Sequence, residues 1–357
     1  MSLFPKSKQV VLPDVYKRQV YTMRGKKQIP VKTAQAGDIL VATKLQETAT
    51  GDTLCDKKQP IVYEAPAYAQ PMLMMAIQAK KKGEEDKLGS VLAKIAEEDP
   101  TIRVRKDAET KEVLVYGVGE LHLDVLVERM QRKYGVEAAL TQPVVPFRET
   151  IRAKAKAENK YKKQSGGHGQ YGHVLLEIEP REAGSGNEFT ETIFGGSVPR
   201  QYVPAVEKGV VEALAGGVLA GYPVVDVKVN LYDGSYHNVD SSELAFKIAA
   251  INAVRKGVMD ARPVLLEPIY NLEIAVPDYY MGDIIGGLNA RRARILGTDI
   301  SGKGLGVIKA QAPLAELYKY ATVLRSASQG RGSFTMKFSH YEEMPQRFAD
   351  EVIAAKK

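Results

Sequence analysis

Two segments of this chain, residues 71–143 and 267–357, carry the same order of apolar patterns, and this repeat constrains the fold more than any other feature. In each segment, runs with strand-like alternation are interrupted twice by runs with helical spacing. The predicted order is strand, helix, strand, strand, helix, strand. This order is typical of a ferredoxin-like fold, so we expect two domains of that kind.

The first segment predicts a helix over 84–98 that ends before Pro100. The residues expected on its buried face are Leu88, Val91, Leu92 and Ile95. A second helix is predicted from Gly119-Glu120, with apolar residues Leu121, Leu123, Val125, Leu126 and Met130. His122 lies in the first turn of that helix, where a structural role is favoured over a catalytic one.

The second segment predicts helices over 281–296 and 313–327 and a last helix after Pro345. Strands are expected near 305–311 and over 333–341. The first helix is expected to end with several arginines, Arg291, Arg292 and Arg294, followed by Gly297. Arginines there would complement the helix dipole, but their clustering favours phosphate contact. Few acidic residues lie nearby in sequence, so we expect all three arginines to be exposed.

Between the two repeats, residues 231–258 predict a strand, a polar loop and a helix. We interpret Asp233-Gly234 as a turn and Asp240 with Glu243 as a capping box. Helical spacing then predicts a buried face that contains Leu244, Ile248, Ile251 and Val254. The loop carries Tyr236, His237 and Asn238 at its apex. For an arbitrary loop, the simplest interpretation is a connection with one exposed histidine.

A second polar loop, QSGGHGQYGH at 164–173, contains four glycines. The segment before it is basic, with Arg152, Lys154, Lys156, Lys160, Lys162 and Lys163 against Glu149 and Glu158. Slim glycines, amides and lysines suit a tip that contacts an RNA backbone. A nucleotide-phosphate loop is the alternative, but it requires a following helix N-terminus. Residues 174–180 alternate like a strand, which weakens that alternative.

Composition sets broad limits on the class of protein. The 357 residues predict two to four domains, and a net charge of +7 permits a polyanionic partner. A single cysteine, Cys55, excludes an intramolecular disulfide and a thiolate metal cluster, and we expect no metal site. No run of 18 apolar residues and no apolar leader occur, so we predict a cytoplasmic protein without a membrane partner.

Several long stretches resemble one known family, elongation factor G. QSGGHGQYGH, GGSVPRQYVPAVEKGV (195–210), LAGYPVVDVKVNLYDGSYHNVDSSELAFK (219–247) and PVLLEPIYNLEI (263–274) are similar to domain IV of the bacterial factor and the start of its domain V. AEEDPTIRV and GVGELHLDVLVERM resemble its domain III. The resemblance covers about 20–357.

This resemblance implies an α+β multidomain chain. Residues 20–60 would be the last strands of the domain II β-barrel, and 66–143 would be the ferredoxin-like domain III. Residues 144–266 would form domain IV, a ribosomal-protein-like α/β fold with a left-handed crossover, and 267–357 the ferredoxin-like domain V. Residues 1–19 fit no pattern, and DVYKRQ matches a translated sequencing adapter, so we interpret them as an artefact or tag.

The implied function is that of the ribosome-binding part of a translational GTPase that drives tRNA–mRNA translocation. The tip of domain IV would act at the small-subunit decoding region. The RNA-binding residues implied there are Lys163, Gly167, His168, Gln170, Tyr171, Tyr236, His237 and Asn238. Segments 282–297 and 324–334 resemble the parts of domain V that face large-subunit RNA. The RNA-binding residues implied there are Arg291, Arg292, Arg294, Ser326, Gln329 and Arg331.

The chain contains no G-x-x-x-x-G-K-[ST] motif. We therefore expect no cofactor and no catalysis in these residues; GTP and Mg²⁺ would bind in a separate GTPase domain. The implied partners are the ribosome, tRNA–mRNA and that GTPase domain, and we expect a monomer. Where the family commonly has Arg and Asp, this chain has His168 and Asn238, which leaves a ribosome-protection or recycling paralogue open. More remote alternatives are a small-molecule kinase-like domain and a module without RNA affinity.

Overall fold

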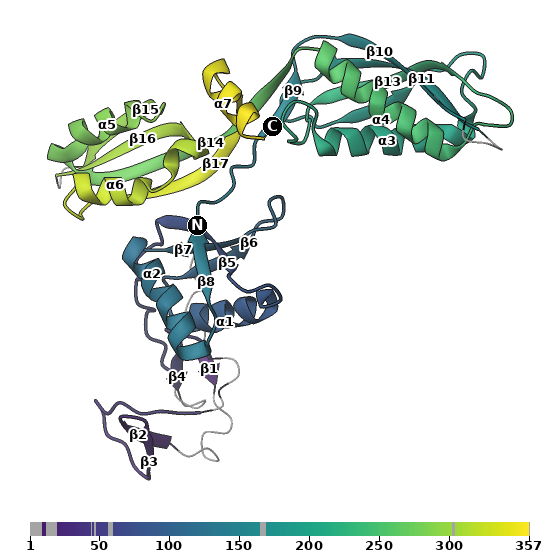
Figure 1. The fold of residues 1–357 in the computed structure, drawn as a ribbon. Coiled ribbons are helices and arrows are strands. Elements are labelled where there is room, and N and C mark those ends of the chain that lie inside the picture. Colours follow the sequence, from purple (N-terminus) through teal and green to yellow (C-terminus); the bar gives the residue numbers. More distant parts are fainter. Residues whose placement is uncertain are drawn as a thin grey trace. The chain divides into compact units, whose positions relative to one another are not determined.

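The computed structural model describes residues 9–11, 20–43, 45, 48–55, 60–164, 169–301 and 304–356. The chain separates into two compact units, 1–143 and 144–357, and each unit is described by itself (Figure 1). Among the described residues, no helix has the length and apolar character needed to cross a membrane.

The first unit begins with short strands. β2 (Val20–Arg24) and β3 (Lys27–Val31) form an antiparallel hairpin, whose turn includes Gly25 at a φ of 58°. β4 (Thr53–Cys55) pairs in parallel with β1 (Gln9–Val11). The described part of this region therefore forms two-stranded sheets. β1 lies within residues 1–19, the segment interpreted as an artefact or tag.

The remainder of the first unit has the predicted order of elements. Its sheet has the strand order β6-β7-β5-β8, with antiparallel pairs throughout. The elements are β5 (Leu73–Ala79), α1 (Glu85–Glu98), β6 (Arg103–Lys106), β7 (Val113–Gly117), α2 (Glu120–Arg129) and β8 (Ala138–Thr141). The four residues predicted on the inner face of α1 are all buried, so that prediction is confirmed.

The second helix predicted for this unit is α2, which begins at Glu120, but its apolar residues do not all face the core. Leu123, Leu126 and Met130 are buried, whereas Leu121 is 76% exposed and Val125 is also exposed. The buried residues follow one another at spacings of three and four, which is one helical stripe, and Leu121 and Val125 lie off it. Because the apolar residues of α2 occupy more than one face of the helix, the sequence alone does not show which of them face the core.

His122 has a structural place, as predicted. Its Nδ1 accepts a hydrogen bond from the Val118 N–H at 3.2 Å, and its Nε2 lies 3.2 Å from Asp99 Oδ2. Burial would raise the pKa of the Asp99 carboxyl, but hydrogen bonds from Thr101 and His122 outweigh burial and hold that pKa below its usual value. The histidine thereby ties the start of α2 to the end of α1.

The second unit starts with a four-stranded sheet of order β10-β11-β13-β12. β12 and β13 are parallel and are joined through α3, and the other pairs are antiparallel. Figure 1 shows α3 and α4 side by side on one face of this sheet. The elements are β9 (Arg148–Ile151), β10 (Ala155–Lys163), β11 (Gln170–Pro180), β12 (Glu188–Glu191), α3 (Val203–Gly216), β13 (Val227–Ser235) and α4 (Glu243–Asp260).

The predicted cap and buried face of α4 are wrong in part. The N-cap is Ser242, whose side chain accepts from the Ala245 N–H, and Leu244 is 55% exposed. The inner face is instead formed mainly by small residues, Ala245, Ala249, Ala250 and Ala253, together with Phe246 and Val254. The helix lies very close to the sheet: a Cβ on Gly172 would stand 2.5 Å from the Ala245 carbonyl oxygen. Close approach therefore selects alanine over larger apolar residues.

Asp233-Gly234 is not the predicted turn. Both residues belong to β13, at a place where the register with β11 shifts between Leu175 and Leu176. A Cβ on Gly234 would lie 2.4 Å from the His173 carbonyl oxygen. The glycine is needed because another backbone approaches it closely. An Asp-Gly pair is also common in turns, so the local sequence does not distinguish the two cases.

The second ferredoxin-like order is confirmed, with strand order β15-β16-β14-β17. β14 (Pro263–Pro277) is one continuous strand that pairs first with β9 and then with β16 and β17, and it crosses the predicted boundary at 266. The other elements are α5 (Met281–Asn289), β15 (Arg294–Ser301), β16 (Leu305–Pro313), α6 (Tyr320–Ala327), β17 (Ser333–Glu343) and α7 (Gln346–Lys356).

The predicted helix over 281–296 ends earlier, at Asn289. The Ala293 N–H bonds to the Leu288 carbonyl and the Arg292 N–H to the Asn289 carbonyl, and Arg292 has a φ of 57°. This is a Schellman motif with arginine at the position where glycine is usual. Because the sequence carries no glycine there, it gives no sign that the helix stops. Arg294 therefore opens a strand and shares no helix face with Arg291.

Candidate nucleic-acid interface

The two polar loops singled out in the sequence meet at one end of the β10–β13 sheet. The Tyr171 N–H donates to the Asp240 carbonyl oxygen at 2.8 Å, and the Gly169 N–H donates to Asp240 Oδ1 at 2.9 Å. Asp240, predicted as a helix cap, instead connects the loops. We name the end formed by 160–164, 169–173 and 235–242 the tip. Gly167 and His168 lie outside the described residues.

His237 is held by its own loop, and no described residue bonds to Nε2 at the outer edge of its ring. The N–H groups of Val239 and Asp240 point at its Nδ1 from 3.3 and 3.2 Å. In the neutral ring Nδ1 is therefore the acceptor, and the proton resides on Nε2. The imidazole is more than half exposed, so Nε2–H is available as a donor.

Tyr171 of the glycine-rich loop contacts the other loop of the tip. Its hydroxyl is 2.7 Å from Ser235 Oγ, and its ring centroid is 6.2 Å from that of His237. The Lys160 ammonium lies 5.4 Å from the centroid of the same ring. Gln170 accepts a hydrogen bond from the Tyr161 hydroxyl at 3.2 Å through Oε1, so its amide nitrogen remains the donor end. The remaining described residues of the predicted tip set, Lys163, Tyr236 and Asn238, are exposed.

The basic segment that precedes the glycine-rich loop divides into two parts. Lys154 and Lys156 pair with Glu179 and Glu177 at 2.9 and 3.8 Å, and Arg152 pairs with Glu343. In the described part of the chain, Lys162 and Lys163 are exposed and no carboxylate lies within ion-pair distance of them. Within this segment, the described lysines without a described carboxylate partner are therefore those at the tip.

A third loop, residues 192–202, borders the tip and was not assigned a role from the sequence. The Tyr202 hydroxyl donates to the Ser241 carbonyl at 3.2 Å. A hydrogen bond from Ser197 holds the pKa of the Asp233 carboxyl, on the neighbouring strand, below its usual value. Phe194 in this loop is 93% exposed, before two glycines with positive φ. The Phe-Gly-Gly sequence is the signal that could have marked an exposed loop here.

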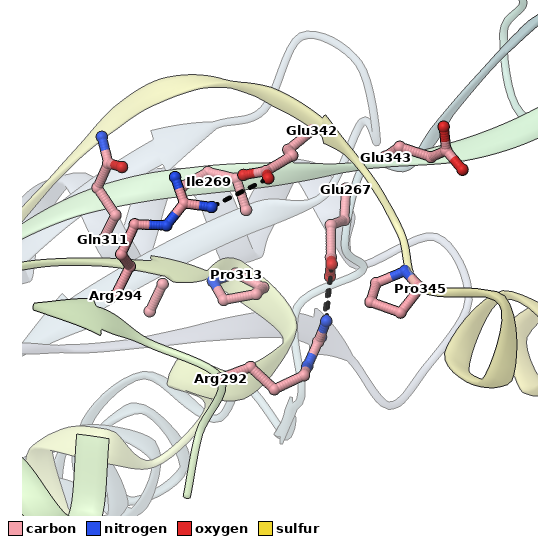
Figure 2. Close-up of a pocket in the computed structure, with 10 residues that line it drawn as sticks. Glu267, Ile269, Arg292, Arg294, Gln311, Pro313, Glu342, Glu343 and Pro345 are labelled. Carbon is pink, nitrogen blue, oxygen red and sulfur yellow. Dashed lines mark hydrogen bonds and ion pairs between the residues drawn. The ribbon is translucent and has the colours of Figure 1, made fainter. Parts of the chain in front are cut away.

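Arg292 lies inside an ion cluster, contrary to the expectation of exposure. Its two terminal nitrogens donate to the two oxygens of Glu267 at 2.7 and 2.9 Å (Figure 2). Its Nε donates to Glu316 Oε1 at 2.9 Å. Glu267 is only 3% exposed, and the guanidinium also lies 4.2 Å from the Phe348 ring centroid. Burial would lower the pKa of Arg292, but the two carboxylates outweigh burial and raise it. The acids were not foreseen because they are distant in sequence.

Arg291 and Arg294 have different surroundings. Arg291 is half-buried, donates to the Glu316 carbonyl at 2.7 Å and lies against Tyr320. Burial raises the pKa of the Tyr320 hydroxyl to about 12. Arg294 is exposed and pairs with Glu342 at 3.2 Å, at the rim of a hollow of about 190 Å³ (Figure 2). Of the three arginines, Arg294 is the most accessible to an external phosphate.

The second predicted segment of this domain forms a fixed turn after α6. Ser328 is fully buried; its hydroxyl donates to the Leu324 carbonyl at 2.6 Å and accepts from the Gly332 N–H at 2.7 Å. Around this anchor, Ser326, Gln329 and Arg331 are exposed. Arg331 donates to the Tyr279 hydroxyl. The turn thus holds an arginine and a glutamine at the surface.

Comparison with known proteins identifies the family of each part. Three family profiles match: "Elongation Factor G, domain III" over 68–142, "Elongation factor G, domain IV" over 143–262 and "Elongation factor G C-terminus" over 264–352. A crystal structure of a protein from Thermus thermophilus is similar, with 40% sequence identity and a TM-score of 0.74. The match covers 95% of this chain and 51% of that protein, so the chain spans about half the length of its relative.

Proposed function

The chain belongs to the elongation factor G family, and from this premise we propose that it is the ribosome-facing part of a translational GTPase that promotes tRNA–mRNA translocation. The observation that carries the proposal is the joining of two loops, far apart in sequence, into one tip through Asp240. That tip presents a histidine N–H, an amide and lysines that no described carboxylate pairs with, which are donors suited to an RNA backbone.

The proposed mechanism is positioning without bond chemistry. The tip enters the small-subunit decoding region, where Gln170 and His237 donate to the codon–anticodon duplex and oppose its return. The exposed lysines at the end of β10 neutralise backbone phosphates. In domain V, Arg294, Arg331 and Gln329 contact large-subunit RNA. GTP and Mg²⁺ bind in a GTPase domain outside the matched residues, and domain III couples hydrolysis to the tip. We place this activity in the cytoplasm and expect a monomer.

Replacing His237 by alanine, in a full-length family protein that carries this sequence, should slow translocation by about tenfold. The substitution removes one donor to RNA, worth roughly 1 to 1.5 kcal/mol, while ribosome-stimulated GTP hydrolysis stays nearly unchanged. Single-turnover translocation and phosphate release, measured on the same ribosomes, separate the two steps. Lost hydrolysis with normal translocation per GTP would contradict the assignment. Glu207→Ala, at an exposed site on α3, is the matched control.

Replacing Arg294 and Arg331 by alanine should weaken ribosome binding and flatten its salt dependence. Each lost phosphate contact should reduce the slope of log affinity against log salt by roughly 0.7 to 0.9. Both side chains are exposed and their internal partners are at the surface, so the melting temperature should change little. Sedimentation with ribosomes at several salt concentrations measures the slope. An unchanged slope would remove both residues from the interface.

A ribosome-protection or recycling paralogue remains the second candidate, because Asn238 stands where the family usually has an acid at the tip. A reconstituted elongation assay decides between the two functions: the elongation factor sustains repeated translocation, and the paralogue does not. A kinase-like phosphate loop is disfavoured because β11 begins at Gln170, within the glycine-rich loop, so a strand and not a helix N-terminus continues the chain there.

A further inference from the structure

A continuous series of hydrogen bonds crosses three strands and leads from Glu158 on β10 into the tip. Ser235 Oγ, at the end of β13, lies 2.7 Å from the Tyr171 hydroxyl and 2.7 Å from His173 Nδ1. The other ring nitrogen of His173, Nε2, lies 2.8 Å from Glu158 Oε1 on β10. Two charged residues lie beside these hydrogen bonds. They are Lys160, which is opposite His173 in the β10–β11 register, and Asp233 on β13.

The donor and acceptor roles in this series of hydrogen bonds can all be assigned in one consistent way. Glu158 can only accept when ionised, so His173 Nε2 carries the proton and Nδ1 accepts. Ser235 then donates its one hydroxyl hydrogen to Nδ1, and its lone pair is left to accept from the Tyr171 hydroxyl. Each member therefore orients the next, from Glu158 to Tyr171.

Tyr171 transmits this order to the tip. Its backbone N–H holds Asp240, and its ring lies beside the His237 imidazole. His173 itself has a side chain that is only 15% exposed, so it offers little surface for direct contact with a partner. The hydrogen-bonded path from His173 to the loop of His237 runs through Ser235 and Tyr171.

We propose that His173 is a positioning residue of the tip: its hydrogen bond to Ser235 orients the Tyr171 side chain, and Tyr171 in turn sets where His237 is presented. This inference rests on the proposed function, because it assigns His173 a role in the same RNA contact. It goes further in naming a bond, between His173 Nδ1 and Ser235 Oγ, on which the contact depends.

Three substitutions of His173 separate the two ring nitrogens. Asparagine places an amide oxygen near the position of Nδ1 and keeps the Ser235 bond, whereas glutamine reaches toward Glu158 and loses Ser235. With the full chain and purified small ribosomal subunits carrying mRNA and tRNA, His173→Ala and His173→Gln should bind about three- to tenfold more weakly. His173→Asn should stay within about twofold of the unmodified chain. Ser235→Ala should match His173→Ala, and the double variant should be no weaker than either one.

A spectroscopic measurement decides the inference independently of ribosomes. In chain labelled with ¹³C-tyrosine and ¹⁵N-histidine, the Tyr171 ring and the His237 imidazole signals should move in His173→Ala and Ser235→Ala and return in His173→Asn. The inference would be overturned if His173→Ala bound as tightly as the wild type. It would also be overturned if the Tyr171 and His237 signals of that variant did not move. If the unmodified chain does not bind ribosomes, the proposed function fails, and the spectra still test the positioning.

Discussion

Replacing Glu149 by alanine is expected to destabilise the second compact unit by about 3 to 5 kcal/mol, one of the two largest effects that we predict. Glu149 is fully buried at the start of this unit, on β9. Its carboxylate accepts four backbone N–H groups from the segment after α3: Val218, Leu219, Ala220 and Tyr222, at 2.7, 2.8, 2.7 and 3.1 Å. Alanine would leave these donors without an acceptor.

Two further variants test this explanation. Glu149→Gln keeps one acceptor oxygen and turns the other into a donor that faces N–H groups, so it should recover only part of the lost stability. Glu207→Ala removes an exposed glutamate from α3 and should change the free energy of unfolding by less than about 0.5 kcal/mol. Urea unfolding followed by circular dichroism gives the three values. A Glu149→Ala protein within about 1 kcal/mol of the wild type would refute the proposed role of this carboxylate.

Replacing Arg292 by alanine is expected to lower the stability of the C-terminal domain by about 3 kcal/mol, because it leaves the Glu267 carboxylate buried without its cation. The same substitution at Arg294 should cost less than about 1 kcal/mol, since that arginine pairs with Glu342 at the surface. The two arginines are near neighbours in sequence, and the difference in the expected loss of stability follows from the burial of their partners alone.

The backbone at Arg292 requires a separate control, because its φ of 57° is unfavourable for alanine as well as for arginine. Arg292→Gly relieves that strain and still removes the ion pair. It should therefore remain clearly destabilised, although less than Arg292→Ala. Thermal unfolding of the three variants provides the comparison. If Arg292→Gly proved as stable as the wild type, the ion cluster would contribute no more than the backbone strain that glycine relieves, and Arg292 would again be a candidate for RNA contact.

The elements could be predicted from the sequence wherever a local pattern was unambiguous. The inner face of α1, the strand that follows the glycine-rich loop and the repeated strand-helix order all follow from periodicity over short distances. The two loops of the tip were also identified correctly as a pair, since their residues resemble one family domain. Their joining through Asp240 was not foreseen, because Asp240 also fits a helix cap.

What the amino-acid sequence determined by itself is the order of helices and strands and the polar, basic character of the tip. The tertiary structure alone decided which face of α4 is buried, why Gly234 is a glycine and where α5 ends. It also decided that Arg292 is an internal ion-pair partner while Arg294 stays at the surface. The reason is physical: periodicity reports local geometry, whereas close backbone approach and buried charge pairs join residues that are distant in sequence, as Arg292 and Glu267 are.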